Sequence, residues 1–202
     1  MQSDTVGAGQ TDDKQAAILM AAFDAFRTYG FRRASMEDIA RRAGMSRASI
    51  YLKFKNKEAI LSALVQRYFD DAVDKMTAAL DAAGDPADAL AGAFAVKVAA
   101  PFDALMTSPH GEELMDAKIT VAADVAAAGE ARIVEVLADW LARAEGKGIV
   151  SLEAYGSAEQ TAATIYDALH GVVMSARDYD VLLADLDRLA TLIGQGLRPA
   201  RS

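Results

Sequence analysis

The chain has 202 residues, a formal net charge of −8 and no cysteine. Its length is sufficient for one or two domains with a substantial core. The absence of cysteine excludes disulfide bonds, thiolate metal sites and Cys nucleophiles. No run of about 18 apolar residues occurs, and the N-terminus lacks the basic region and apolar core of a secretion signal, so we expect a cytoplasmic protein that does not enter a membrane.

Positive charge is concentrated in one part of the chain. Residues 27–57 carry a net charge of +7, so the remaining residues together carry −15. A basic segment joined to an acidic remainder is the charge distribution expected of a nucleic-acid-binding protein. The acidic remainder also opposes indiscriminate binding along DNA. The charge pattern therefore indicates DNA binding in spite of the acidic total.

The chain is expected to begin with a disordered arm and a supporting helix. Residues 1–13 are small, polar and acidic and show no hydrophobic period, so we expect them to be disordered. From Lys14 onward, apolar residues recur with helical spacing up to Tyr29. Gly30 then permits the left-handed backbone conformation that ends many helices. We assign this helix to a DNA-binding domain that spans residues 14–56.

Two short helices joined by a tight turn follow. Ser35 and Asp38 have the spacing of a capping box at a helix N-terminus. Gly44 ends this helix, and Ser46 caps the next one two residues later. A turn of about three residues that contains glycine is typical of the DNA-binding helix-turn-helix. The alternative is an ordinary helical hairpin with a solvated basic face.

The second of these helices carries the side chains that we expect to contact base edges. Ile50 and Phe54 face inward, which leaves a polar and basic outer face. Arginine bonds guanine, serine suits several acceptors and alanine contacts the thymine methyl group, whereas tyrosine and lysine suit phosphate. The predicted base-reading residues are Ser46, Arg47, Ala48, Ser49 and Tyr51.

Phosphate contacts are expected beside this helix. Asn56 caps the following helix, whose first amides and Lys57 both suit a phosphate oxygen. Lys53 is a further phosphate candidate at the end of the second helix. Arg33 either contacts phosphate or is simply solvated.

The segment from about Ile18 to Leu64 resembles the N-terminal DNA-binding domain of the TetR family of bacterial transcriptional regulators. The matching motifs are Ala21-Ala22-Phe23, Tyr29-Gly30-Phe31, Ser35-Met36, Asp38-Ile39-Ala40, Ala43-Gly44-Met45-Ser46, Ser49-Ile50-Tyr51 and Asn56-Lys57-Glu58. One departure is Lys53, which stands before Phe54 where the family usually has His or Tyr. The resemblance implies that Ser35, Lys53 and Lys57 clamp phosphates.

The rest of the chain, residues 57–202, is expected to be helical throughout. Apolar residues keep a helical period from Lys57 to Ala83, which predicts one long connecting helix. Asp85 and Pro86 begin the next helix, and Gly129 ends a later one. No strand pattern of useful length occurs, so we expect an all-α fold. The resemblance implies that this part binds an effector and forms a dimer.

The last two helices are expected to form the dimer interface. A capping box at Ser157 and Gln160 begins the first of them, and Asp180 caps the second. The resemblance implies that the pair meets its copy as a four-helix bundle through Ile165, Leu169, Val172, Val173, Leu186, Leu189 and Ile193. The alternative is a helical pair buried inside one monomer.

The resemblance places an effector pocket among the helices between the long helix and the final pair. Aromatic and methionine side chains shape apolar pockets that contain a few polar groups. The candidate lining residues are Phe94, Phe102, Met106, Met115, Trp140, Tyr166, His170 and Met174. Core packing is the alternative role for each of them. His110 and His170 have no carboxylates at metal-binding spacing, so we expect neither a metal nor a cofactor.

These observations favour a dimeric transcriptional regulator, most simply a repressor, that binds a palindromic operator and is released by a small and largely apolar effector. Two alternatives have different signatures. A non-specific architectural protein would bind all duplexes with equal affinity. A helical enzyme would require a catalytic motif, and we find no glycine-rich phosphate loop, no Cys nucleophile, no supported Ser-His-Asp grouping and no HExxH motif.

Overall fold

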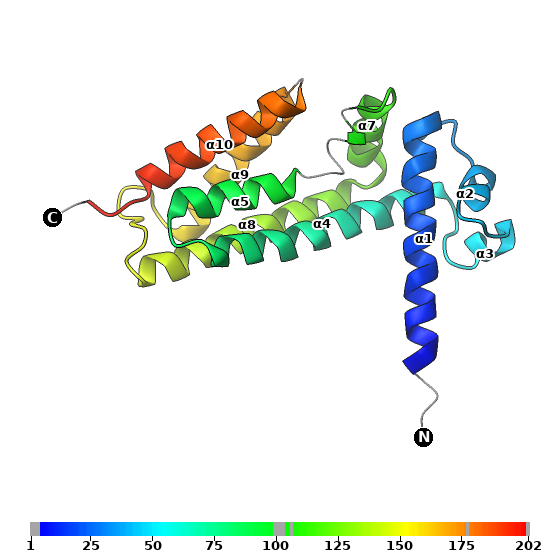
Figure 1. Cartoon of the computed structure of the whole chain (residues 1–202), viewed down its shortest axis with the longest axis horizontal. Coiled ribbons are helices and arrows are strands. Elements are labelled where there is room, and N and C mark those ends of the chain that lie inside the picture. The colour runs from blue at the N-terminus through cyan, green and yellow to red at the C-terminus, as the bar shows by residue number, and fades with distance from the viewer. Residues whose placement is uncertain (1–4, 99–103, 106, 177, 201–202) are drawn as a thin grey trace. The chain divides into compact units, whose positions relative to one another are not determined.

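The computed structural model describes residues 5–98, 104–105, 107–176 and 178–200 (Figure 1). Within these residues every regular element is a helix, which confirms the predicted all-α class. In chain order the helices are α1 (Thr5–Tyr29), α2 (Met36–Arg42), α3 (Arg47–Tyr51), α4 (Lys57–Ala82), α5 (Pro86–Lys97), α7 (Gly111–Val121), α8 (Ala123–Gly146), α9 (Ala158–Ser175) and α10 (Tyr179–Gly196).

The chain folds into two compact units. The first unit contains Met1–Arg67 together with Thr107–Ala126, and the second contains Tyr68–Met106 together with Ala127–Ser202. This division differs from the predicted domains, because α7 belongs to the unit of α1, α2 and α3 although α4 and α5 separate it from them in the sequence. Hydrophobic periodicity reports which face of a helix is buried, not which distant segment buries it.

Helix α1 is longer than the sequence analysis predicts. It begins at Thr5, so residues 5–13 continue the helix instead of forming the expected disordered arm. No proline occurs in these residues, so every backbone amide in the stretch is able to donate a helical hydrogen bond. The predicted start at Lys14 marks where the apolar period begins, not where the helix begins.

The first unit is held together by a small apolar core. Helix α1 packs against α2, and α2 packs against α3. Phe26, Ile39 and Ile50, one from each helix, are fully buried. The two predicted helix-ending glycines have positive φ angles, +81° at Gly30 and +64° at Gly44. Glycine adopts these angles without steric cost, so both turns close tightly and α3 is fixed against the other two helices.

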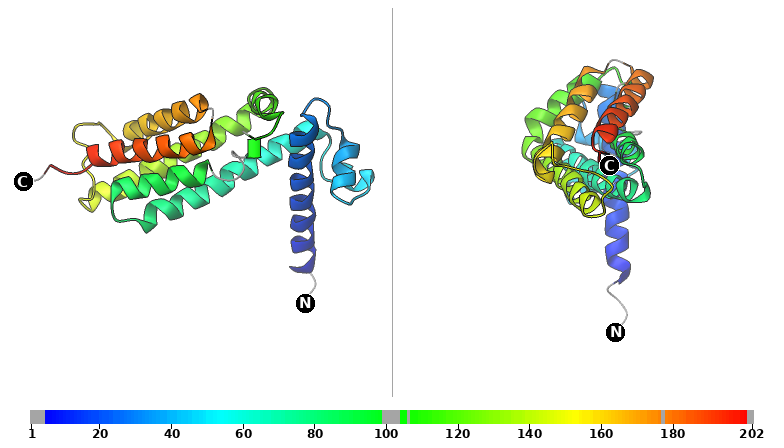
Figure 2. Two further views of the ribbon diagram at one scale, coloured as in Figure 1. Left: turned by 45° about the horizontal axis from the view of Figure 1, so that its top comes forward. Right: turned by 90° about the vertical axis from the view of Figure 1, so that its left-hand side faces the viewer.

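The second unit is a bundle of longer helices. Helix α10 packs against α5 and α9, and Figure 2 shows these helices side by side. Gly194 of α10 permits a close approach to α5, since a Cβ atom there would lie 2.4 Å from the backbone of Ala87. Ion pairs join α4 to α8, from Asp70 to Arg132 at 2.5 Å and from Asp81 to Arg143 at 2.8 Å. These contacts fix the helices in register.

Two predicted helix boundaries are wrong. Gly129 lies inside α8 instead of ending a helix, because it makes room for the ring of Phe69; a Cβ at this position would lie 2.2 Å from Phe69 Cγ. The cap of α10 is Asp178, whose carboxylate accepts from the Val181 amide, instead of Asp180. The predicted caps at Asp85 and Ser157 are confirmed.

Candidate nucleic-acid interface

The start of each helix in the helix-turn-helix is fixed by a side-chain cap. The Ser35 hydroxyl accepts from the Asp38 amide at 3.2 Å, and the Ser35 amide donates to the Asp38 carboxylate at 3.1 Å. These two bonds confirm the predicted capping box of α2. The Ser46 hydroxyl accepts from the Ser49 amide at 3.1 Å and so caps α3. Both helices therefore begin at defined residues, which sets the direction of α3.

Helix α3 presents a continuous polar face to solvent. Its one buried residue is Ile50, while Arg47, Ala48, Ser49 and Tyr51 are exposed. Every predicted base-reading residue, Ser46 included, is therefore accessible. A surface that contacts DNA must be exposed in this way. The individual contacts with DNA bases remain a prediction.

The Arg47 side chain is held above Tyr51, one turn further along α3. Its guanidinium carbon lies 5.3 Å from the centre of the Tyr51 ring, and Nη2 donates to Tyr51 Oη over 3.4 Å. The hydrogen bond to Tyr51 raises the pKa of Arg47 above its usual value. The guanidinium is thus cationic at every physiological pH, and its five donors remain on the exposed face.

The three serines predicted to contact DNA, Ser35, Ser46 and Ser49, already have hydrogen-bond partners. The Ser46 and Ser49 hydroxyl oxygens lie 2.8 Å apart. The Ser35 hydroxyl donates to Asp38 Oδ2 at 2.6 Å. Each serine oxygen retains acceptor capacity, but its position is dictated by the cap. We therefore assign these serines first to holding the helices.

Lys57 does not have the free ammonium group that a phosphate contact requires. Its Nζ donates to the carbonyl oxygens of Phe31, Arg32 and Ala34, at 2.7, 2.8 and 3.1 Å. An ammonium group has three hydrogens, so these bonds use all of them. The structure thus gives Lys57 a different role from the one expected: it ties the start of α4 to the loop between α1 and α2.

The other phosphate candidates are open to solvent. Arg33 and Lys53 are both exposed. Asn56 caps α4 as predicted, since its side-chain oxygen accepts from the Ala59 amide at 2.9 Å. Leu52, which the sequence analysis did not select, is 86% exposed beside Tyr51 and Lys53. An apolar side chain at that exposure is the one signal that marks Leu52 as a candidate contact for a thymine methyl group.

Helix α7 and the residues just before it support the end of α1 and the loop that follows it. Glu113 Oε1 accepts from the Arg32 amide at 2.7 Å, and Ser108 donates its hydroxyl to the Arg27 carbonyl at 2.9 Å. A Cβ atom at Gly30 would lie 2.4 Å from Glu113 Oε2, so the glycine makes room for this carboxylate. Glu113 is accordingly partly buried, whereas its neighbour Glu112 is exposed.

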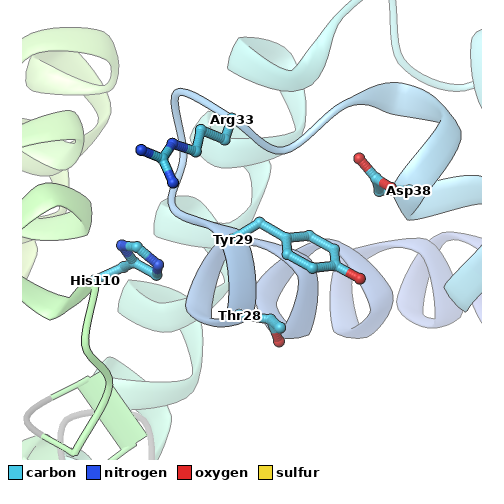
Figure 3. Close-up of a pocket in the computed structure, with 5 residues that line it drawn as sticks. All are labelled: Thr28, Tyr29, Arg33, Asp38 and His110. Atoms are coloured by element: carbon cyan, nitrogen blue, oxygen red, sulfur yellow. The ribbon is translucent and has the colours of Figure 1, made fainter.

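A polar cavity of about 300 Å³ lies at the end of α1. Its lining residues are Thr28, Tyr29, Arg33, Asp38 and His110, and Figure 3 shows them around the loop that leaves α1. Asp38 is already bonded to Ser35 and to Arg41. The lining is polar and belongs to the first unit, so this cavity is not the apolar effector pocket that the resemblance implies.

The predicted effector-pocket residues that the structure describes belong to both units. Phe102 and Met106 lie outside the described residues. Met115 lies on α7, which is part of the first unit. Met174 is 48% exposed on α9. The remaining candidates are in the second unit, where three are buried and His170 is partly buried: Phe94, Trp140, Tyr166 and His170.

The predicted dimer residues also divide into two groups. Ile165, Leu169 and Leu186 are at most 3% exposed inside the second unit, so they belong to its core and do not form a surface. Their helical spacing identifies a buried face but not the element that buries it. The partly buried members are Val172, Val173, Leu189 and Ile193. Val181 and Leu192 of α10, which were not selected, are 55% and 73% exposed.

Within the described residues, no group of three or more His, Asp or Glu side chains has an arrangement that could hold a metal ion. In the same part of the chain, no helix is long and apolar enough to cross a membrane.

The sequence of the DNA-binding part of the chain matches a known family. Residues 18–64 match the family described as "Bacterial regulatory proteins, tetR family". The HTH-type transcriptional regulator EthR of Mycolicibacterium smegmatis is 39% identical over 74 residues, which cover 33% of this chain and 34% of that protein. The matched segments span between about a quarter and a half of the length of the curated relatives.

Solved structures extend the likeness over nearly the whole chain. The fatty acid degradation regulator FadR from Bacillus halodurans matches with a TM-score of 0.71 and 25% identity, over 93% of this chain and 97% of that one. The FadR structure from Bacillus subtilis in complex with stearoyl-CoA matches with a TM-score of 0.69 and 19% identity, over 91% and 99%. The second likeness shows the fold alone.

Proposed function

Because the chain belongs to the TetR family of bacterial regulatory proteins, which are helix-turn-helix transcriptional regulators and not enzymes, we propose that it regulates transcription by binding a specific DNA operator. The observation that carries the proposal is the exposed face of α3, where Arg47 is open to solvent and donates a hydrogen bond to the Tyr51 hydroxyl. We further propose that it acts in the cytoplasm as a repressor.

Base reading is assigned to α3. In this proposal Arg47 bonds a guanine edge in the major groove, while Ala48, Ser49 and Leu52 contact neighbouring bases. Tyr51 keeps the guanidinium in place and adds a polar contact of its own. Arg33 and Lys53 contact phosphates, and the capping serines and Lys57 hold the loop and helices that position these groups.

The regulator is proposed to act as a homodimer. Helices α9 and α10 retain apolar side chains that their own unit does not cover, including Val172, Val181, Leu189 and Leu192. A two-fold dimer through this surface would place two copies of α3 on half-sites about 34 to 36 Å apart on a palindromic operator. Leu192→Arg should convert the dimer to a monomer in light scattering, and an unchanged mass would contradict this interface.

Regulation is proposed to come from a small molecule bound in the second unit. The B. subtilis FadR structure was solved with stearoyl-CoA, which supports a ligand-responsive role for the fold. Helix α4 has residues in both units, so a ligand that shifts α4 would change DNA affinity by a coupling of typically about 1 to 3 kcal/mol.

The operator is best identified by selecting duplexes from a random pool with the purified protein. The proposal predicts an enriched palindrome that is protected in a footprint, with half-sites one helical turn apart. Enrichment without a common sequence would favour the alternative of a non-specific architectural protein.

A further inference from the structure

The loop between α1 and α2 presents two neighbouring arginines to solvent. Phe31 and Ala34 are buried, whereas Arg32 and Arg33 between them are exposed. Within the residues that the structure describes, neither guanidinium group is ion-paired with a carboxylate. Arginines that do have an aspartate partner are Arg41, Arg42, Arg132, Arg143, Arg188 and Arg198. The donors of the two loop arginines are therefore available to a ligand, and the planar guanidinium group suits phosphate oxygens.

Charged side chains from two helices hold the backbone of Arg32. Glu113 Oε1 of α7 accepts from the Arg32 amide at 2.7 Å, and Lys57 Nζ of α4 donates to the Arg32 carbonyl at 2.8 Å. Hydrogen bonds to ionised groups are about twice as strong as those between neutral groups. One bond fixes the amide side of the residue and the other fixes its carbonyl side.

The carboxylate of Glu113 is packed against this loop. A Cβ atom at Gly30 would lie 2.4 Å from Glu113 Oε2, so the glycine leaves room for the carboxylate at the start of the loop. On its other side, His110 Nδ1 lies 3.7 Å from the same oxygen. Both carboxylate oxygens of Glu113 therefore face groups of its own unit, and neither faces outward as a free surface charge.

We propose that Glu113 is a positioning residue for DNA binding, which holds Arg32 and Arg33 in place for contact with DNA phosphates. It acts through the backbone of the loop and does not touch DNA itself. A loop that is already ordered loses less conformational entropy when its side chains bind a ligand. The inference rests on the proposed function in taking DNA as the ligand, and it adds Arg32 to the phosphate contacts.

Charge and position make opposite predictions for Glu113. Its carboxylate lies beside two arginines that bind phosphate, so a purely electrostatic role predicts that Glu113→Ala binds DNA more tightly. A positioning role predicts weaker binding, because the Arg32 amide loses its acceptor and the loop loses order. The sign of the change in affinity therefore separates the two roles.

Titration of the whole chain with a random-sequence duplex at several salt concentrations tests the proposal. At physiological salt Glu113→Ala should weaken binding by about fivefold or more, the effect of freeing one residue of the backbone. The salt slope should fall by up to about 2, because each lost phosphate contact accounts for about 0.9. Glu113→Gln should recover most of the affinity, since its side-chain oxygen still accepts from the Arg32 amide.

Glu112→Ala is the matched control. Glu112 is the neighbouring residue of α7, carries the same charge and is exposed. Its removal should not weaken DNA binding. Circular dichroism at the assay temperature shows that each variant is folded, so that a loss of affinity is not confused with unfolding.

The arginines themselves show whether Glu113 acts through them. A variant with both Arg32→Ala and Arg33→Ala should lower the affinity and the salt slope without any change in α7. Adding Glu113→Ala to this variant should weaken binding no further, because residues that act through one contact are not additive. This variant keeps the test decisive even if Glu113→Ala alone does not fold.

Three results would each overturn the proposal. They are tighter DNA binding by Glu113→Ala, an unchanged salt slope in the double arginine variant, and an equal effect of Glu113→Ala with and without the arginines. Failure of the proposed function is a different result, in which the parent binds selected and random duplexes equally. Phosphate contacts carry no sequence information, so the effect of Glu113 on a random duplex is measured independently of that outcome.

Discussion

The face of α3 and the surroundings of Lys97 place positive charge in opposite environments. Arg47 is exposed to solvent above Tyr51, so its guanidinium group has little desolvation cost and is accessible to a binding partner. Lys97 is buried in the second unit, where burial lowers the pKa of its ammonium group and the negative charge of Glu130 acts in the opposite direction. The comparison teaches that an exposed cation is available to a partner from outside the chain, whereas a buried cation acts on the groups packed around it.

The largest effect on stability is expected at Ile50, the buried residue that holds α3 against the rest of its unit. Ile50→Ala should lower the free energy of unfolding by about 2 to 5 kcal/mol, because it leaves a cavity under the one buried side chain of α3. Leu52→Ala, two residues away and 86% exposed, should leave stability unchanged. Denaturant titration measures both. Equal losses would mean that exposure on α3 does not separate contact residues from core residues.

Lys57 tests whether a lysine near the DNA-binding face acts through the protein or through DNA. Lys57→Met should lower stability by about 1.5 to 3 kcal/mol, since three carbonyl oxygens lose a charged donor. Lys55→Met, at an exposed neighbouring position, is the matched control and should leave stability unchanged. If Lys57→Met were as stable as the parent but bound DNA with a reduced salt slope, Lys57 would be a phosphate contact after all.

Substitution of Arg47 tests whether the exposed face of α3 contacts DNA bases. Arg47→Ala should weaken operator binding by about 1 to 3 kcal/mol and relax base preference at one position, without changing the thermal midpoint. Arg188→Ala removes an exposed arginine of α10 that is paired with Asp185 and should have no effect on DNA binding. A uniform loss of affinity for all duplexes would assign Arg47 to phosphate instead of bases.

The smallest effect concerns the α2 cap and has a defined pH dependence. Ser35→Ala should cost about 1 kcal/mol at neutral pH through loss of the cap. Hydrogen bonds from the Ser35 side chain and then its amide lower the pKa of Asp38 in the folded state. Their stabilisation is therefore complete above the unfolded pKa and is lost as the pH falls through the lower, folded pKa.

Urea titrations of parent and variant from pH 7 to pH 2 measure this dependence. The difference between them should shrink only below about pH 4, the region in which an unfolded Asp becomes protonated. Ser175→Ala, whose hydroxyl donates to a carbonyl and caps no N-terminus, is the control. A difference independent of pH would remove Asp38 from the capping account.

Local chemistry made the DNA-binding unit readable from sequence. Ser35, Ser46 and Asn56 act on backbone groups within three residues of themselves, so spacing alone identifies each cap. Gly30 and Gly44 adopt the positive φ angles that their positions predict. The exposed face of α3 follows from the same short-range pattern.

Features that depend on distant partners could not be read in this way. Gly129 looks like a helix end until Phe69, sixty residues earlier in the chain, is seen against it. Lys57 looks like a phosphate clamp until the loop carbonyls are placed around its ammonium. Lys97 has no signature at all, because a lysine at a helix end is ordinary unless its burial is known.

The most direct test of the central claim is the affinity of the purified protein for a selected duplex against a scrambled duplex of the same composition. Both are titrated at physiological salt, because phosphate contacts make affinity strongly dependent on ionic strength. An operator-reading regulator should prefer the selected duplex by about a thousandfold or more. Equal and salt-sensitive binding to both duplexes would contradict base reading by α3. It would show that the protein binds only the phosphate backbone of DNA.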